Sequence, residues 1–266
     1  MPPGVAGRRT APTSIPEPKV LYPTMEEFSD FMGFIKSIED SGDSRAGICK
    51  IVPPKEWVPR KAGYDLNDMN YTIQGPIKQN FKNFGDRGCF QTKGIIRQQM
   101  SVLEYHKLAH SDKYKTPRHD SYDDLEKLYW KSLAYGPPVY GCDVSNAISD
   151  PDLEVWNIAK LDSILKTVSE DLNEEIQGVN TPYLYFGMWK ATFSWHVEDM
   201  DLYAINHIHQ GYVNCSCILR RSEKYDEISK KIWCFDVRSF NVIERFCQVF
   251  VAFSIVGASI VIYKPI

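Results

Sequence analysis

One short stretch of the sequence carries two side chains that could bind a metal together. His196 and Glu198 stand one residue apart in FSWHVEDMDLYAINHIHQG, residues 193–211. Alternate side chains of a β-strand project from one face, so an imidazole nitrogen and a carboxylate oxygen can reach the same ion. Such donors suit Fe(II), manganese or zinc, and two histidines with one carboxylate and open positions are typical of non-haem Fe(II) oxygenases. The spacing alone is weak evidence, because it arises by chance in many chains.

The surrounding residues favour a site over a chance pair. TPYLYFGMW, residues 181–189, and ATFSWHVEDMDLYAINHIH, residues 191–209, are rich in aromatic and branched side chains. This composition predicts two β-strands. Asn206 has the same parity as His196 in the second strand, so its amide could hydrogen-bond a bound acid near the metal.

Helices are predicted before this β-rich centre. An amphipathic pattern capped by Thr24 and closed by Gly42 predicts a helix between these two residues. Apolar periodicity and capping signals predict further helices, and apolar runs bounded by turn residues predict further strands. The other predicted helices are 101–110, 121–135 and 152–172, and the other predicted strands are 47–52 and 89–96.

Composition limits the classes of partner. The 266 residues include 31 basic and 34 acidic side chains, a net charge of −3, so any contact with chromatin or lipid must be local. Seven cysteines without a framework spacing indicate reduced thiols of the cytosol or nucleus. The first 19 residues are rich in proline and lack an apolar leader, which predicts a disordered arm.

Other histidines have weaker claims to a metal. His106 and His110 would share one face of a predicted helix, as in some zinc sites. No third ligand stands at a suitable spacing, so ordinary surface or half-buried roles are favoured. His207 and His209 fall on the opposite strand face from the metal pair, which favours structural roles for them.

Longer stretches of the sequence resemble a known family. YPTMEEF and SRAGICKIVPPKEWVPR, within residues 22–60, look like a jumonji N domain. Residues 116–211, which contain TPRHDSYDDLEKLYWKSLAYGPPVYGCDV and GVNTPYLYFGMWKATFSWHVEDMDLYAINHIHQG, resemble the start of a jumonji C domain. Paired in this way, the two resemble the histone lysine demethylases that act on trimethylated lysines 9 and 36 of histone H3.

The resemblance implies a fold, a chemistry and a cellular setting. The fold is α+β, a double-stranded β-helix of the cupin-like jelly-roll type with a helical cover, incomplete in this chain. The chemistry is that of a dioxygenase with Fe(II) and 2-oxoglutarate as co-substrate, which removes N-methyl groups as formaldehyde. The implied partners are the histone H3 tail with its methylated lysine and chromatin in the nucleus. Neither sequence-specific nucleic-acid binding nor a membrane partner is expected.

Four residues match family positions at the metal and the co-substrate. His196 and Glu198 match the first two iron ligands and are the catalytic residues that the resemblance implies. Tyr140, in PPVYGCDV, and Asn206 match residues that hold a carboxylate end of 2-oxoglutarate.

Four further residues match family positions that contact the substrate. Gly178, Tyr183 and Tyr185, in GVNTPYLYFG, match the wall of the methyl-lysine pocket. There, polarised C–H groups of the trimethylammonium meet oxygen acceptors. Asp143 matches a position that contacts the peptide.

The resemblance also divides the chain into five parts. It implies a disordered arm at 1–19, a jumonji N domain at 20–62, a connecting mixed α/β region at 63–149, the N-terminal part of a jumonji C domain at 150–211 and a divergent tail of unknown structure at 212–266.

The family pattern breaks after Gly211. The family has a lysine three residues further on that pairs with the distal carboxylate of 2-oxoglutarate, whereas this chain has the neutral, shorter Asn214. No histidine follows His209, so the family's third iron ligand is missing from the sequence. Cys215 and Cys217 stand in the wrong place for the family's structural zinc, which is therefore not supported. We expect a chain truncated within the jumonji C domain, with an incomplete iron site.

Two alternatives for the function therefore stay open. The chain is either a fragment of an active demethylase or a catalytically inactive short isoform that acts as a chromatin-binding regulator. In the tail, residues 249–263 form a run of 15 apolar or small residues, short of the roughly 18–20 that cross a bilayer. This run favours a buried strand or an alternative end over a membrane anchor.

Overall fold

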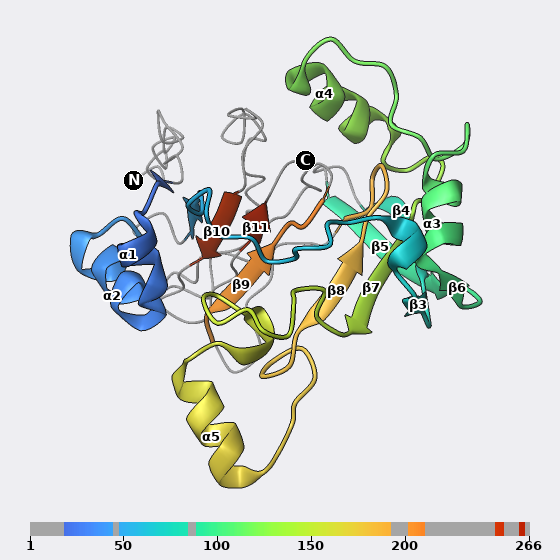
Figure 1. Ribbon diagram of the computed structural model, residues 1–266. Helices are drawn as coiled ribbons and strands as arrows, with labels where there is room; N and C mark the ends of the chain where they lie inside the picture. Colours follow the sequence, from blue (N-terminus) through green and yellow to red (C-terminus); the bar gives the residue numbers. More distant parts are fainter. Residues whose placement is uncertain are drawn as a thin grey trace, which may run out of the picture.

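The computed structural model describes residues 19–44, 48–84, 89–192, 202–210, 248–252 and 261–263. Helices and mainly antiparallel sheets alternate along the chain, which confirms the predicted α+β class (Figure 1). The helices are α1 (Met25–Ser29), α2 (Phe31–Ser41), α3 (Val102–Ala109), α4 (Tyr122–Ser132) and α5 (Ile164–Leu172), with 3-10 turns at Leu66–Asp68 and Ile158–Lys160.

The strands form three sheets that do not close into a barrel within the part of the chain described. They are β1 (Lys19–Leu21), β2 (Ile48–Ile51), β3 (Thr72–Ile73), β4 (Ile77–Phe84), β5 (Cys89–Ile96), β6 (Met100–Ser101), β7 (Val139–Ser145), β8 (Tyr183–Phe186), β9 (Ala204–His207), β10 (Gln248–Ala252) and β11 (Val261–Tyr263). The first sheet has the order β1-β2-β10-β11, with β9 also paired to β10. The second is β3-β6 and the third is β5-β4-β7-β8. Only the β1–β2 pair, among those described, is parallel.

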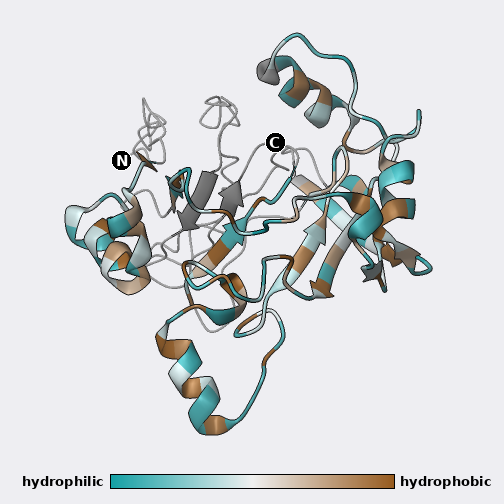
Figure 2. Cartoon of the chain, viewed as in Figure 1, coloured by the Kyte–Doolittle hydropathy of each residue, from teal (hydrophilic) through white to brown (hydrophobic). Residues whose placement is uncertain are grey.

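Helices lie at several edges of this β-rich centre. In Figure 1, α1 and α2 lie at one end of the molecule, and α3 lies at the other end with β3 and β6. Helix α5 extends away from the sheets, and Figure 2 shows hydrophobic and hydrophilic residues alternating around it. Its apolar side chains Ile164 and Leu172 are 69% and 63% exposed.

The first predicted helix is divided into two. Thr24 and Glu27 form the expected capping box, in which hydrogen bonds from Thr24 lower the pKa of the Glu27 carboxyl. The Asp30 side chain then accepts a 2.9 Å hydrogen bond from the Gly33 N–H and starts α2 as its N-cap. Gly42 ends α2 in the left-handed conformation, φ 75°, as expected. Asp30 thus breaks the helix because its carboxylate accepts a backbone N–H that a continuous helix would pair with a carbonyl.

An aromatic cluster joins these N-terminal helices to residues more than a hundred positions away. Trp156 is 2% exposed, and its ring stacks on Phe28 with centroids 4.5 Å apart and planes at 7°. The Trp156 indole N–H donates a 2.6 Å hydrogen bond to the Phe28 carbonyl. A second indole connects the same parts of the chain: the Trp57 N–H donates a 2.7 Å hydrogen bond to the Val155 carbonyl. The Trp57 ring also meets the Phe28 ring edge-on. The two segments therefore share one core.

The predicted helix over 152–172 is only partly right. Helix α5 accounts for its second half, whereas the first half contains turns and the 3-10 segment. Trp156 has φ 51°, which is incompatible with a continuous helix, and the Asn157 side chain caps the 3-10 turn by accepting from Ala159 N–H. Burial of the Trp156 ring against Phe28 overrides the local helical periodicity.

The helices predicted over 101–110 and 121–135 are confirmed as α3 and α4. Ser101 and Glu104 form a capping box at α3. At the C-terminal end of α4, the buried Lys190 ammonium donates a 2.9 Å hydrogen bond to the Ser132 carbonyl and another to the Tyr135 carbonyl. Burial lowers the pKa of Lys190. The cation therefore satisfies carbonyls that the helix end leaves open.

The tail contributes strands in its described residues. β10 pairs antiparallel with β2, where Phe250 lies opposite Lys50, and it also pairs with β9 and β11. Residues 248–252 and 261–263 are therefore strands. Among the described residues, no helix has the length and apolar character needed to cross a membrane.

Lys50 gives the fold a predicted dependence on alkaline pH. Lys50 lies in β2 and is 6% exposed, and burial lowers the pKa of its ammonium group from 10.5 to about 8. Between these two values the unfolded chain binds more protons, so the free energy of unfolding is expected to rise with pH. Lys50→Met should reduce this rise by on the order of 1–3 kcal/mol. Urea unfolding of both proteins at pH 7.5, 9 and 10 measures it, and parallel pH curves would contradict the prediction.

Candidate functional site

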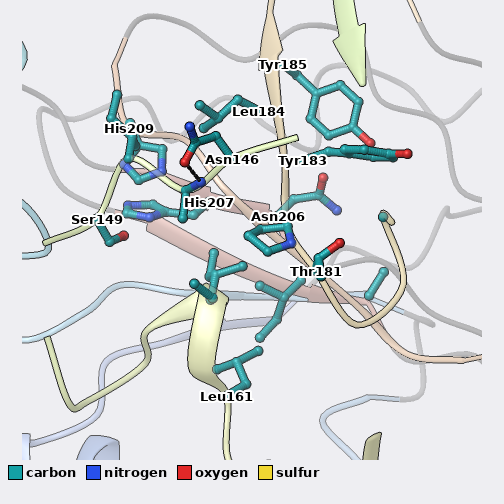
Figure 3. A pocket seen from close by; sticks show the side chains of 18 of the residues that line it. Asn146, Ser149, Leu161, Thr181, Tyr183, Leu184, Tyr185, Asn206, His207 and His209 are labelled. Atoms are coloured by element: carbon teal, nitrogen blue, oxygen red, sulfur yellow. Dashed lines mark hydrogen bonds between the residues drawn. The ribbon is translucent and has the colours of Figure 1, made fainter. Parts of the chain in front are cut away.

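The six predicted site residues that the structure describes all line one cavity. Its volume is about 1570 Å³, and its walls include β7, β8, β9 and the loop before β8, together with parts of α2, α3 and α5. The six are Tyr140, Asp143, Gly178, Tyr183, Tyr185 and Asn206. Figure 3 shows Tyr183, Tyr185 and Asn206 around this cavity. The predicted iron ligands His196 and Glu198 lie outside the described residues.

Tyr140 provides a buried hydroxyl on β7. The residue is 7% exposed, and its ring lies nearly parallel to that of Tyr185 on β8, with centroids 6.1 Å apart. Burial, and then the neighbouring Tyr185, raises the pKa of Tyr140 well above its usual value. The phenol therefore stays protonated and can donate a hydrogen bond to a bound carboxylate.

Asp143 occupies an irregularity of the same strand. The β7–β8 register shifts between Gly141 and Val144, and Asp143 has φ 57° and an exposed side chain. An extra residue of this kind turns a side chain out of the regular ladder. Burial, followed by the nearby Asp143 charge, raises the pKa of the adjacent Cys142 thiol to about 12, so this thiol stays protonated.

Gly178 forms a close support for the Tyr183 ring. Its φ is +82°, and a Cβ atom at this position would lie 2.3 Å from Tyr183 Cε2. The Tyr183 ring meets the Tyr185 ring edge-on at 6.3 Å. Only a residue without a side chain leaves room for this arrangement, so Gly178 fixes where the two tyrosines stand.

The loop that carries Gly178 is held by a residue that we did not predict. The Asn180 side chain accepts a 2.7 Å hydrogen bond from Ile176 N–H and donates to Ser169 Oγ at 2.6 Å and to the Glu174 carbonyl at 3.0 Å. It thereby ties α5 to the loop before β8. The available signal was an asparagine followed by Thr-Pro at the start of a strand, which is typical of a turn.

Strand β9 presents Asn206 to the cavity beside two packed histidines. Asn206 is half-buried, and the ring centroids of His207 and His209 lie 3.9 Å apart (Figure 3). His209 Nδ1 shares a 3.1 Å hydrogen bond with the Tyr64 hydroxyl. Burial, and then the charge of Arg60, lowers the pKa of His209 to about 3, so its ring is neutral. These contacts suit the structural role expected for it.

The described donors fit a carboxylate co-substrate. The protonated Tyr140 hydroxyl and the Asn206 amide both line the cavity, and each is a donor that can bind a carboxylate without adding a charge. For the metal, the imidazole and carboxylate of His196 and Glu198 are donors that suit Fe(II), as the sequence indicates. Among the residues that the structure describes, no three potential ligands stand close enough to hold a metal ion.

Comparison with known proteins shows which family shares these elements. The family described as "jmjN domain" matches residues 19–53, and the one described as "JmjC domain, hydroxylase" matches residues 183–234. Lysine-specific demethylase 4B of Mus musculus is 50% identical over 189 residues, 71% of this chain and 17% of that protein. Parts of this chain thus match both family models, and 71% of it is similar to a lysine-specific demethylase.

Two further relatives match to a similar extent. Probable lysine-specific demethylase 4F of Homo sapiens is 45% identical over 190 residues, 71% of this chain and 29% of that protein. Lysine-specific demethylase 4D of Rattus norvegicus is 45% identical over 192 residues, 72% of this chain and 37% of that protein. The chain therefore spans well under half the length of these relatives.

The JmjN match covers β1, α1, α2 and β2, which are the elements packed around the aromatic cluster. The JmjC match begins at β8 and includes Tyr183, both predicted iron ligands and Asn206. It continues to residue 234 and so contains residues on both sides of Gly211.

Proposed function

We propose that this chain carries the site of an Fe(II)- and 2-oxoglutarate-dependent histone demethylase that acts in the nucleus on methylated lysine 9 or 36 of histone H3. The observation that supports this most is the single cavity that joins residues predicted for the co-substrate with residues predicted for the methyl-lysine. The names of the relatives, which are lysine-specific demethylases, support the same class of reaction.

The co-substrate end of the cavity would be formed by Tyr140 and Asn206. Both offer neutral hydrogen-bond donors, and the near-parallel Tyr185 ring covers Tyr140 on one side. Donors held in place by packing bind a carboxylate without reorganising, which favours one orientation. His196 and Glu198 would hold the iron. Bound iron would use dioxygen and 2-oxoglutarate to hydroxylate the N-methyl group; 2-oxoglutarate would become succinate and carbon dioxide, and the hydroxylated methyl carbon would leave as formaldehyde.

The methyl-lysine would lie between the Gly178 loop and the tyrosines. The Gly178 backbone and the hydroxyls of Tyr183 and Tyr185 offer oxygen acceptors to the polarised C–H groups of a trimethylammonium. Asp143, on the bulged part of β7, is exposed at the cavity and would contact the peptide backbone or a basic neighbour of the lysine. The role of the protein is thus to place one methyl group at the metal.

Formaldehyde release tests the proposal. The purified 266-residue chain, supplied with Fe(II), is incubated with H3 peptides trimethylated at lysine 9 or at lysine 36. When a polypeptide that carries the missing half of the jumonji C domain is added, we expect formaldehyde in both or in one of these reactions, only when 2-oxoglutarate is present, and none after chelation of the iron. Release that persists without 2-oxoglutarate would contradict this mechanism, and the two peptides report the lysine preference.

An inactive chromatin-binding regulator is the second proposal. It is favoured by Asn214, which replaces a charged family residue. This alternative predicts that the chain binds the trimethylated peptide more tightly than the unmethylated one, yet releases no formaldehyde. Release that depends on 2-oxoglutarate and is lost in His196→Ala would reject it.

A further inference from the structure

We propose that the outer face of the β4–β5 hairpin binds the phosphate backbone of duplex DNA without sequence preference. We call this surface the basic face. Its defining cations are Lys78, Lys82, Lys93 and Arg97. It is separate from the demethylation cavity, since none of these four residues lines that cavity.

The register of the hairpin places these cations together. In the antiparallel pairing Lys78 lies opposite Ile95, Asn80 opposite Lys93 and Lys82 opposite Gln91. Directly paired residues, and residues two apart along a strand, project from the same side of the sheet. All these side chains therefore share one face.

The other face of the hairpin packs inward on β4. Phe81 is 7% exposed and belongs to a cluster with Tyr129 and Leu133. Gln79 is 7% exposed, and its side-chain amide and the Thr192 backbone exchange hydrogen bonds in both directions. These contacts cover the odd-numbered face of β4 at Gln79 and Phe81, whereas β5 is exposed on both of its faces from residue 91 to 96. The basic face, on the even-numbered side, is consequently the outward one.

The cations follow one another along the ribbon at regular intervals. The Arg97 N–H donates a 2.8 Å hydrogen bond to the Pro76 carbonyl, so Arg97 extends the ladder beyond β5. From that end the order is Arg97, Lys78, Lys93 and Lys82, which alternate between the strands. One positive charge thus occurs about every 7 Å over about 20 Å. A DNA strand carries one phosphate about every 3.4 Å of its axis, so this row would follow roughly six base pairs.

The electrostatic setting favours an anionic partner. Lys82, Lys93 and Arg97 are exposed and Lys78 is half-buried. No acidic residue stands in residues 76–84 or 89–99. Within the described residues, none of the four cations takes part in an ion pair. This local excess of positive charge contrasts with the net charge of −3 of the whole chain.

The remaining side chains of the basic face favour nucleic acid over a lipid surface. Asn80 and Gln91 offer amide groups that can hydrogen-bond phosphate and sugar oxygens. A membrane-binding surface would combine its cations with large apolar side chains that enter the headgroup layer, whereas Ile95 is the single such residue between the Pro76–Arg97 and Lys82–Gln91 pairs of the described hairpin. The twisted two-stranded ribbon has no base-reading motif, so we infer contact with the backbone alone.

Fluorescence anisotropy with a labelled 20-base-pair duplex of random sequence tests this surface. The affinity is measured between 50 and 200 mM KCl, without iron or 2-oxoglutarate, so failure here is distinguishable from failure of the demethylase proposal. Four phosphate contacts predict a slope of log K against log salt of about −3.6. Lys82→Gln/Lys93→Gln should weaken binding at least tenfold at 100 mM and reduce the slope to about −1.8.

Two matched variants separate charge at this face from charge in general. Lys107→Gln/Lys131→Gln removes two exposed lysines from α3 and α4 and should leave the slope unchanged. Lys82→Arg/Lys93→Arg keeps the charge and should keep the affinity. An equal loss of duplex affinity in the two glutamine variants would overturn the proposal. Tighter binding to phosphatidylserine vesicles than to the duplex, lost in Lys82→Gln/Lys93→Gln, would assign the face to membranes and also overturn it.

Discussion

Gly178→Ala is expected to weaken binding of a trimethylated H3 peptide at least tenfold. The substituted residue would have to keep φ +82°, and its Cβ would lie 2.3 Å from Tyr183 Cε2 and 2.8 Å from Cδ2. Because these distances are shorter than any tolerated contact, the Tyr183 ring must swing out of its position. The left-handed backbone adds about 1–2 kcal/mol of strain. Isothermal titration calorimetry with the methylated and unmethylated peptides measures the loss.

Gly63→Ala is a matched control for the backbone strain. Gly63 has φ +70°, but a Cβ there would meet nothing within 4 Å, and the residue does not line the cavity. Both variants should lose about 1–2 kcal/mol of unfolding free energy, while only Gly178→Ala should lose peptide affinity. If the two variants bind the peptide equally well, Gly178 and Tyr183 do not form the lysine pocket.

Trp156→Ala is expected to have the largest effect on stability. The substitution removes a fully packed indole, its stacking on Phe28 and its hydrogen bond to the Phe28 carbonyl. Truncation of a buried tryptophan typically costs about 3–5 kcal/mol. For a chain of this size the melting temperature should fall by roughly 10 °C. Thermal unfolding followed by circular dichroism measures the change.

Trp156→Phe separates the packing from the hydrogen bond. Phenylalanine at position 156 keeps an aromatic ring against Phe28 but leaves the Phe28 carbonyl without the indole donor. The free energy of unfolding should therefore fall by about 1–2 kcal/mol. A loss below about 1 kcal/mol for Trp156→Ala would show that the aromatic cluster does not couple the two segments.

The elements that sequence predicted well are those with local causes. Thr24 and Ser101 cap helices through contacts with residues only three positions away, and Gly42 ends α2 by its own backbone conformation. The elements that sequence predicted poorly depend on distant partners. Trp156 leaves the helical conformation because Phe28, far away in the sequence, receives its ring.

The site was predicted by resemblance rather than by spacing. Tyr140, Gly178 and Asn206 are far apart along the chain, and no periodicity connects them. The cavity that they share forms only when β7, β8 and β9 are placed in the fold. The role of Asn180 as a tie for the Gly178 loop depends on acceptors in α5 and could not be read from a local pattern. The assignment of each residue to iron, co-substrate or peptide stays a prediction.

The aromatic cluster also limits how segments can be exchanged between this chain and its relatives. Phe28 belongs to the JmjN segment and Trp156 to a segment that precedes the JmjC match, yet each completes the other's packing and hydrogen bonding. A chimera that exchanges one segment and retains the other would join two surfaces selected in different backgrounds. Substitutions at the two positions should therefore be inherited as pairs, and a grafted JmjN segment should fold well only when residues 155–157 come with it.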